Sequence, residues 1–223
     1  MNIDIDGETA GRVCIVVDVL RASSTMVTLL ERGCERIVVS ADVAQARTLH
    51  ERLPDHLLCG EEGGFPPEGF DHGNSPVEFS RLDLAGKSVI LATTNGTLAL
   101  TRVAGGAAAV LVGCLLNRTA VAEAAARLAS DLGADITVVC AGQSGSPAED
   151  GAAARAIIEA AEGRATPGFD AAREVAESAH AGDLRRIGLG ADVEYCTRLD
   201  TSQVVPVLQP GEDGLLVLRA MQL

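Results

Sequence analysis

The chain has 223 residues, and its balance of 47% hydrophobic and 22% charged residues is typical of a globular protein with a substantial core. A formal charge of −13 and a scarcity of aromatic residues argue against binding of nucleic acid, which requires a basic surface and stacking rings. Residues 1–6 lack the pattern of a secretory signal, and the longest apolar stretch, around 107–116, is too short to cross a membrane. We therefore expect a cytoplasmic protein with no membrane contact and a small partner molecule.

Strands and helices alternate along most of the chain. In chain order, the apolar periodicity predicts a strand at 13–17, a helix at 23–32, a strand at 36–39, a helix at 42–53, a strand at 88–92, a helix at 96–103, a strand at 108–112, a helix at 119–132, a strand at 136–139 and helices at 148–162 and 169–181. Gly33 is expected to end the first helix, and Asp42 to cap the second. Residues 204–208 and 215–219, on either side of a Pro-Gly turn, predict an antiparallel hairpin.

This order of elements predicts an α/β fold with three α/β/α layers and a mostly parallel mixed sheet built from repeated βα units. Residues 13–39 and 88–112 share one pattern of strand, polar turn, helix, glycine and strand. An internal duplication and the generic βαβ unit explain this pattern equally well. We expect one domain over residues 1–223, with two tightly packed lobes divided near residue 84 as the alternative. Assembly into a homo-oligomer is compatible with the sequence.

Three of the predicted strands end in clusters of small polar residues that then begin a helix. These clusters are residues 18–25, 93–97 and 140–146. In an open parallel sheet, ligands bind where strands end and helices begin, because the first N–H groups of a helix are unpaired and carry a partial positive charge. Residues 60–76 follow no period and are rich in glycine and proline, which is typical of an active-site loop. The sequence thus predicts a site for an anion.

Several other kinds of site are absent from the sequence. The six cysteines have neither a CxxC pair nor the spacing of a zinc site, so we expect buried thiols. No GxxxxGK[ST] loop occurs, and position 20 is leucine, where enzymes of the haloacid dehalogenase type carry their second aspartate. We therefore expect neither a nucleotide nor a redox cofactor.

The polar clusters and the loop together resemble the 2-phosphosulfolactate phosphatase (ComB) family. The resemblance covers nearly the whole chain, and it lies, in the same order, in residues 18–25, 69–76, 93–97, 140–142, 149–150 and 178–181, Asp192 and Cys196. It implies a Mg²⁺-dependent phosphomonoesterase that converts 2-phospho-3-sulfolactate and water to 3-sulfolactate and phosphate, a step towards coenzyme M. Such a reaction needs a cation, donors for the phosphoryl oxygens and a positioned nucleophile.

Carboxylates from four separate stretches are candidates for holding Mg²⁺, which takes hard oxygen ligands. The candidate ligands are Asp18, Glu61, Asp71, Glu149 and Asp150. From its position alone Asp18 could equally cap a helix, and Glu149 and Asp150 could simply lie opposite a helix dipole. The resemblance favours the site for Asp18, where it would either hold the metal or attack phosphorus itself.

Arg21 and His180 complete the candidate catalytic residues. Arg21 can donate two hydrogen bonds to a phosphate or sulfonate, or it can form a salt bridge to a neighbouring acid. His180 or His72 could protonate the leaving alkoxide, and a packing role at a helix end is as compatible with the position of His180. Donors for phosphate are expected from residues that could each also cap a helix: Ser23, Ser24, Thr25, Thr94, Asn95, Gly96 and Thr97.

One position departs from the family pattern. Where the resemblance leads us to expect Gly-Glu-Arg, the sequence has Gly60-Glu61-Glu62. An acid facing the pocket would weaken the binding of a doubly charged substrate, since unit charges about 4 Å apart interact by roughly 4 kcal/mol at an effective dielectric constant near 20. Two alternatives therefore stand beside the leading function: a phosphatase for another phosphorylated hydroxy acid, and a non-catalytic anion-binding homologue.

Overall fold

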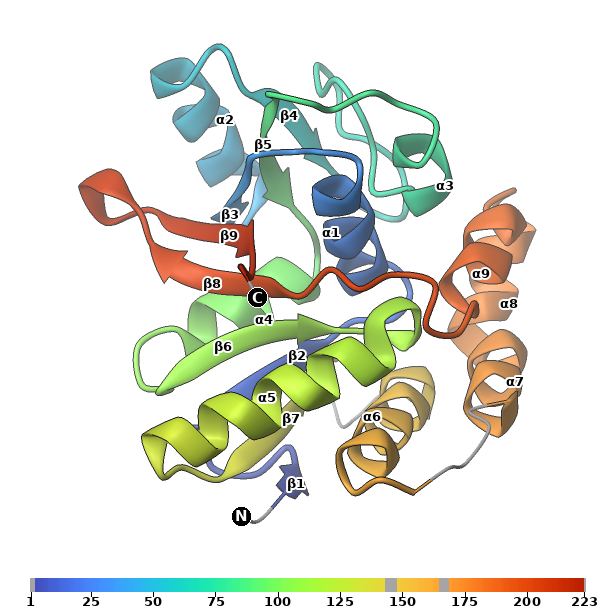
Figure 1. Ribbon diagram of the computed structural model, residues 1–223. Helices are drawn as coiled ribbons and strands as arrows, with labels where there is room; N and C mark the ends of the chain where they lie inside the picture. The colour runs from blue at the N-terminus through green and yellow to red at the C-terminus, as the bar shows by residue number, and fades with distance from the viewer. Residues whose placement is uncertain (1–2, 143–147, 165–168, 223) are drawn as a thin grey trace.

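The computed structural model describes residues 3–142, 148–164 and 169–222. Within them, one mixed sheet carries helices on both faces (Figure 1). Its nine strands are β1 (Ile3–Ile5), β2 (Val13–Val17), β3 (Arg36–Ser40), β4 (Leu57–Gly60), β5 (Ser88–Ala92), β6 (Ala109–Gly113), β7 (Ile136–Cys140), β8 (Pro206–Pro210) and β9 (Leu216–Ala220). Residues 143–146, which complete the third predicted polar cluster, lie outside the described residues.

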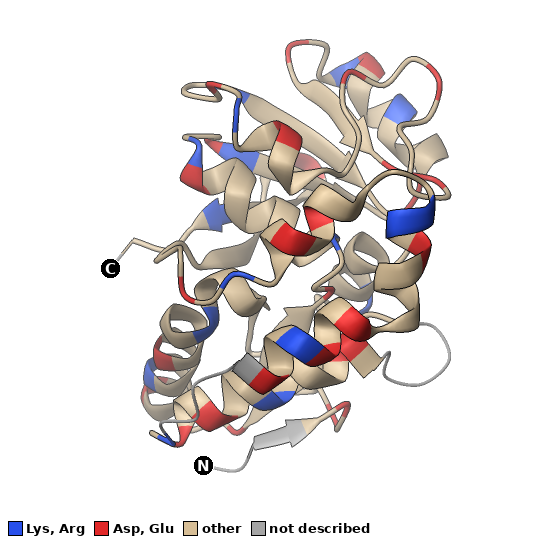
Figure 2. Ribbon diagram, turned by 90° about the vertical axis from the view of Figure 1, so that its right-hand side faces the viewer, with Lys and Arg blue, Asp and Glu red and all other residues tan. Residues whose placement is uncertain are grey.

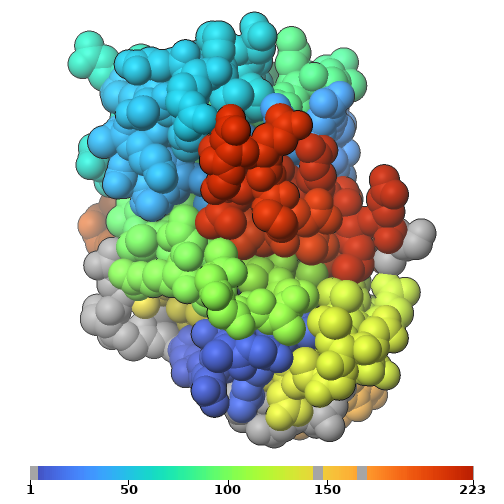
Figure 3. All heavy atoms as spheres, turned by 90° about the vertical axis from the view of Figure 1, so that its left-hand side faces the viewer, coloured from blue at the N-terminus to red at the C-terminus, as the bar shows by residue number. Residues whose placement is uncertain are grey.

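The strand order β1-β7-β2-β6-β8-β9-β3-β5-β4 contains two parallel groups. The first group is β1-β7-β2-β6, and the second is β3-β5-β4. The predicted C-terminal hairpin, β8 and β9, is confirmed, and it joins the two groups by antiparallel pairing with β6 and β3. Figure 3 shows the hairpin, in red, at the surface between light-blue segments from the N-terminal part of the chain and green segments from near residue 100. The last strands of the sequence therefore lie in the middle of the sheet.

Helices cover both faces of this sheet, which confirms the predicted three-layer α/β fold. The helices are α1 (Ala22–Glu31), α2 (Val43–Arg52), α3 (Pro76–Phe79), α4 (Gly96–Val103), α5 (Arg118–Leu132), α6 (Ala148–Ala161), α7 (Phe169–Glu177), α8 (Ala179–Arg186) and α9 (Gly190–Cys196), with 3₁₀ turns at Leu115–Asn117 and Glu212–Gly214. Helices α5 and α6 pack on β2, α2 packs on β4 and β5, and α1 and α4 lie on the opposite face. In the described part of the chain, no helix combines the length and hydropathy of a membrane span.

Strand β2 shows why both faces are covered. Val13, Ile15 and Val17 face the core formed with α5 and α6, whereas Cys14 and Val16 face the core formed with α1 and α4. All five side chains are buried, which explains why the sequence here is a continuous apolar run rather than an alternating one. Helix α1 is buried along Ala22–Leu30, so it fills the space beside the sheet and fixes the residues that precede it.

The six cysteines behave as predicted. All are buried, and no disulfide joins any two of them. Burial raises the pKa of Cys14, Cys34 and Cys114 to about 11. These thiols therefore remain protonated at neutral pH and act as small apolar side chains.

The predicted helix at 169–181 is wrong in its continuity, because it is broken at Ser178. Helix α7 ends at Glu177, and Ser178 begins a new helix, α8, by accepting a hydrogen bond from the backbone N–H of Ala181 at 3.1 Å. Helix α9 follows and packs against α3 from the 60–76 region. This break turns α8 across the carboxyl ends of the strands, as Figure 1 shows for the orange helices.

His56 gives the folded state a predictable dependence on pH. It is 8% exposed, and within the described residues neither ring nitrogen has a hydrogen-bond partner. Burial, reinforced by the charge of Arg36, lowers the pKa of His56. In the unfolded chain His56 binds a proton near pH 6.5, whereas in the folded chain it binds one only at lower pH. The stability contributed by neutral His56 is therefore complete above about pH 6.5 and is lost as the pH falls towards the pKa of His56 in the folded state.

We expect the free energy of unfolding in urea to fall more for the wild type than for His56→Leu when the pH is lowered from about 7.5 to about 5.5. The comparison between the two proteins cancels the contribution of every other titrating group. Equal decreases in the two proteins would contradict the prediction.

Candidate active site

Asp18 lies directly after β2, at the edge where the parallel strands end. Register places Val17 between Gly113 of β6 and Cys140 of β7, so the residues that follow these strands converge. The Asp18 carboxylate, 9% exposed, accepts the N–H of Ala22 at 3.4 Å, and the backbone amide of Gly96 also stabilises its charged form. Asp18 therefore lies between the N-termini of α1 and α4.

The environment of Asp18 raises its pKa to about 6. Burial is the largest cause, and the charge of Glu61 adds to it, while the hydrogen bonds from Ala22 and Gly96 and the charge of His180 act in the opposite direction. A buried carboxylate whose charged form is disfavoured at the end of a strand is characteristic of a functional site.

Two adjoining cavities meet at Asp18. The larger has a volume of about 390 Å³ and the smaller about 200 Å³. Both are lined by Asp18, Leu20, Asn95 and His180. Figure 2 views the molecule from this side and shows acidic and basic residues interspersed over the surrounding helices and loops.

Acids line the smaller cavity, where Glu149 and Asp150 join Asp18. Asp150 accepts the N–H of Val19 at 2.8 Å, and its pKa lies well above its usual range because of burial and then because of the charge on Asp18. In this cavity the structure thus brings together three of the five predicted metal ligands, from β2 and α6.

The donor set of this cavity fits Mg²⁺. In the described residues, no group of three or more His, Cys, Asp or Glu side chains could hold a metal ion by itself. Mg²⁺ is commonly bound in proteins through one or two carboxylates, several waters and substrate phosphate. Asp18 and Asp150 supply two such carboxylates, and a cation beside them would favour the charged forms that burial, and for Asp150 also the charge of Asp18, disfavours.

Glu61 lines the larger cavity, but both of its carboxylate oxygens are engaged. Pairing of Gly60 with Ala92 places Glu61 near Thr94, whose N–H it accepts at 2.8 Å. Its other oxygen accepts the N–H of Gly64 at 3.0 Å. Glu61 therefore shapes the turn that forms one wall of the cavity.

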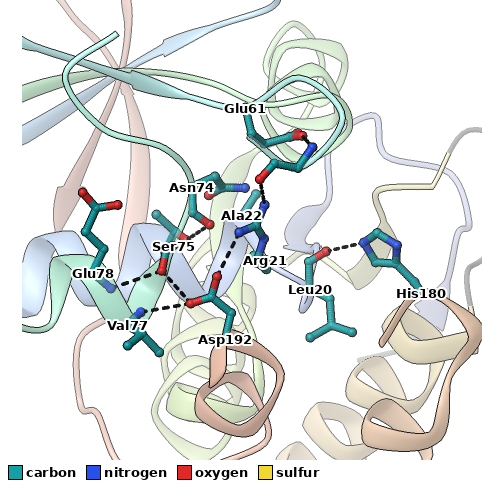
Figure 4. A network of polar contacts seen from close by, with 12 residues as sticks. Leu20, Arg21, Ala22, Glu61, Asn74, Ser75, Val77, Glu78, His180 and Asp192 are labelled. Carbon is teal, nitrogen blue, oxygen red and sulfur yellow. Dashed lines mark hydrogen bonds and ion pairs between the residues drawn. The ribbon is translucent and has the colours of Figure 1, made fainter. Parts of the chain in front are cut away.

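Arg21 lines the same cavity and is held in a buried network (Figure 4). Its Nη1 donates to Asp192 at 2.9 Å, and its Nη2 donates to the carbonyl of Gly64 at 2.8 Å. Asp192 also accepts the hydroxyl of Ser75 at 2.6 Å. The sequence reasoning did not place Asp192 in the site, and its only signal was its position in the family resemblance.

His180 is the histidine that reaches the site, and it projects from α8 towards both cavities. Its Nε2–H donates to the carbonyl of Leu20 at 3.2 Å, which leaves Nδ1 to bind or release a proton. His72 lies elsewhere, with its Nδ1 at 2.6 Å from the carboxylate of Glu78, and it does not line either cavity.

The predicted phosphate donors divide into two groups. Thr94 and Asn95 line the larger cavity, and the N–H of Gly96 faces Asp18. The other four have hydroxyls that donate to backbone carbonyls beneath the site: Ser23 to Val16 at 3.4 Å, Ser24 to Val19 at 2.9 Å, Thr25 to Asn74 at 3.3 Å and Thr97 to Thr93 at 2.9 Å. Three of these hydroxyls bind at the ends of β2 and β5, that of Thr25 holds the loop at Asn74, and none of the four residues lines either cavity.

Two acids of the loop do not line the cavities. Asp71 is exposed and accepts the N–H of Leu58 at 2.8 Å, so the structure does not bring it to the other carboxylates. Glu62, the residue that departs from the family pattern, is also exposed and pairs through its backbone with Phe65. Its charge is not part of either cavity lining.

The family profile and the similar proteins that match this chain all carry the same family name. The sequence profile described as 2-phosphosulpholactate phosphatase matches residues 2–211, which include every residue of the two cavities. A protein of Deinococcus radiodurans is 39% identical over 217 residues, 90% of this chain and 89% of its own length. One of Pseudothermotoga lettingae is 37% identical over 209 residues (87% and 88%), and one of Clostridium acetobutylicum is 32% identical over 219 residues (90% and 91%). All three are named "Probable 2-phosphosulfolactate phosphatase". The chain therefore belongs to the 2-phosphosulfolactate phosphatase family.

Proposed function

We propose that this chain is a Mg²⁺-dependent phosphomonoesterase that hydrolyses 2-phospho-3-sulfolactate to 3-sulfolactate and phosphate, a step towards coenzyme M. The observation that carries the proposal is the position of Asp18. Its buried carboxylate stands where the two cavities meet, between two helix N-termini and beside Asp150. The substrate class follows from the names of the relatives.

The cation, the donors for the phosphoryl oxygens and the proton for the leaving group each have a candidate residue in this site. Asp18 and Asp150, with Glu149 lining the same space, would hold Mg²⁺, which when bound supplies positive charge to the phosphoryl oxygens. Thr94 and Asn95 line the cavity where hydrogen-bond donors for those oxygens are needed. His180, oriented by the carbonyl of Leu20, can hold at Nδ1 the proton that the leaving alkoxide takes as its bond to phosphorus breaks.

The acid at position 62 does not weigh against a doubly charged substrate. Glu62 is exposed and lies outside the cavity lining, so water screens its charge from a bound ligand. The cation that does line the cavity and is buried with its partner is Arg21. We therefore retain 2-phospho-3-sulfolactate ahead of other phosphorylated hydroxy acids.

Phosphate release tests the proposal directly. We expect the purified protein to release phosphate from 2-phospho-3-sulfolactate in the presence of Mg²⁺, to stop when the metal is chelated with EDTA, and to resume when excess Mg²⁺ is restored. A panel of other small phosphoesters, including 2-phospholactate, measures the preference. If no phosphoester is hydrolysed under any of these conditions, a non-catalytic anion-binding role is favoured instead.

A further inference from the structure

We infer that the larger cavity is a subsite for the sulfonate of the substrate and that the side-chain amide of Asn74 donates hydrogen bonds to it. This inference rests on the proposed function, because it assigns one group of that substrate to one part of the site. Asn74 is 4% exposed and lines the larger cavity. It does not line the smaller, acidic one.

The amide of Asn74 is buried without a partner. Within the described residues its side chain makes no hydrogen bond; the carbonyl oxygen is fully buried, whereas the NH₂ group is not among the fully buried atoms. A buried amide loses its hydrogen bonds to water on folding and normally regains them from the protein. Among the residues that the structure describes, the other buried side chain with unpartnered polar atoms is His56, which lines neither cavity at Asp18. The NH₂ group of Asn74, a donor without a partner in the wall of the larger cavity, is therefore the part of this side chain that an anionic ligand can use.

The backbone at Asn74 is held in place on both sides. The hydroxyl of Thr25 from α1 donates to the carbonyl of Asn74 at 3.3 Å. The next residue, Ser75, caps α3 by accepting the N–H of Glu78 and donates its hydroxyl to Asp192. Figure 4 shows Asn74 in the same group as Arg21 and Glu61. Such a fixed position is what a specificity contact needs, since little order is lost when the ligand binds.

The wall of the larger cavity carries charged groups of both signs, and two of its acids, Glu61 and Asp183, already have partners. Glu61 has both oxygens on backbone N–H groups, and Asp183 pairs with Arg186 at the exposed rim. The Arg21 guanidinium pairs with Asp192 and donates to Gly64, and it contributes its charge to the cavity wall. A sulfonate presents three acceptor oxygens, which match the N–H groups of an amide and a guanidinium.

The covalent structure of the substrate agrees with this division. The phosphate and the carboxylate are both attached at C2, whereas the sulfonate is attached at C3, one carbon further along. When the phosphoryl group lies beside Asp18 and Asp150, the sulfonate is the anionic group that reaches further into the adjoining cavity. The larger cavity, about 390 Å³, is the one with space for it.

A pair of substrates that differ only in the sulfonate tests the assignment. In 2-phospholactate a methyl group replaces the CH₂SO₃⁻ group of 2-phospho-3-sulfolactate. We expect Asn74→Ala to lower kcat/KM for the sulfonate substrate roughly tenfold, and Asn74→Asp, which adds a negative charge in the same shape, to lower it further. For 2-phospholactate we expect changes of less than about threefold. Thr48→Asp, which adds the same charge on the exposed face of α2, should change neither rate.

A measurement without turnover gives a second readout. The product 3-sulfolactate should raise the melting temperature of the wild type, lactate at the same concentration should not, and Asn74→Asp should lose the shift. The subsite would be overturned if the Asn74 variants lost kcat/KM equally for both substrates, or if 3-sulfolactate did not shift the melting temperature of the wild type. Failure of the wild type to hydrolyse any phosphoester, with the shift by 3-sulfolactate retained, would instead count against the proposed function alone.

Discussion

Asp18→Asn is expected to lower kcat for phosphate release by roughly 10³-fold or more while leaving the protein folded. The side chain is held between the N–H groups that begin α1 and α4, so asparagine has nearly the same shape in the same place. What it lacks is the negative charge that, with Asp150, would form the proposed cation site. Steady-state kinetics over a range of Mg²⁺ concentrations, with a melting curve for the variant, measure the effect.

Asp71→Asn is the matched control for this prediction. Both aspartates were candidates from the sequence, but Asp71 is exposed and accepts the N–H of Leu58 outside the cavities. We expect its replacement to lower kcat less than about tenfold. The proposed role of Asp18 would be refuted by a variant that keeps most of its activity, or by equal losses at the two positions.

Gly96→Ala should produce the second large effect, because position 96 has no room for a side chain. A Cβ there would lie 2.5 Å from the Cβ of Ala22 and 2.9 Å from Oδ2 of Asp18. The N-terminus of α4 or the Asp18 carboxylate must then move. We expect a loss of about 1–3 kcal/mol in unfolding free energy and a loss of roughly 100-fold in kcat/KM, as displacement of a reacting group by about 1 Å can cause.

Gly182→Ala in α8 makes the corresponding change where there is space. A Cβ at Gly182 meets nothing within 4 Å. Because alanine favours a helix more than glycine does, this variant should be as stable as the wild type or more stable, with unchanged kcat/KM. Wild-type activity and stability in Gly96→Ala would show that the close contact with Asp18 does not constrain the site.

The secondary structure was largely predictable because its signals are local. The apolar run Val13–Val17 is β2 with the predicted bounds, and Asp42 caps α2 by accepting the N–H of Gln45. The hairpin of β8 and β9 was predictable for the same reason, since a turn between two short apolar runs is a local pattern. The break at Ser178 was missed, because a serine inside a helical pattern becomes a cap only when packing ends the preceding helix.

The candidate site was predictable only as a set of positions. Of the five carboxylates proposed for the metal, Asp18, Glu149 and Asp150 line the smaller cavity. Glu61 lines the larger cavity, and Asp71 lines neither. The sequence does not show which of these carboxylates is nearest to a metal site, because each lies in a polar segment next to a strand or helix. Asn74 and Asp192 gave no local signal of their roles, since burial and partners depend on contacts with distant segments.

By itself the sequence determined most of the strands and helices, though not β1, β4, α3, α8 or α9, and which polar clusters follow the strands, because hydrophobic periodicity and capping act over a few neighbouring residues. Tertiary structure decided which of those polar groups meet. The hairpin entered the middle of the sheet, α8 turned across the strand ends, and the hydroxyls of Ser23, Ser24 and Thr25 turned inward while Asp18 remained at the cavity. Strand order and register come from the packing of the whole chain, and they set the distances between side chains on which the chemistry depends.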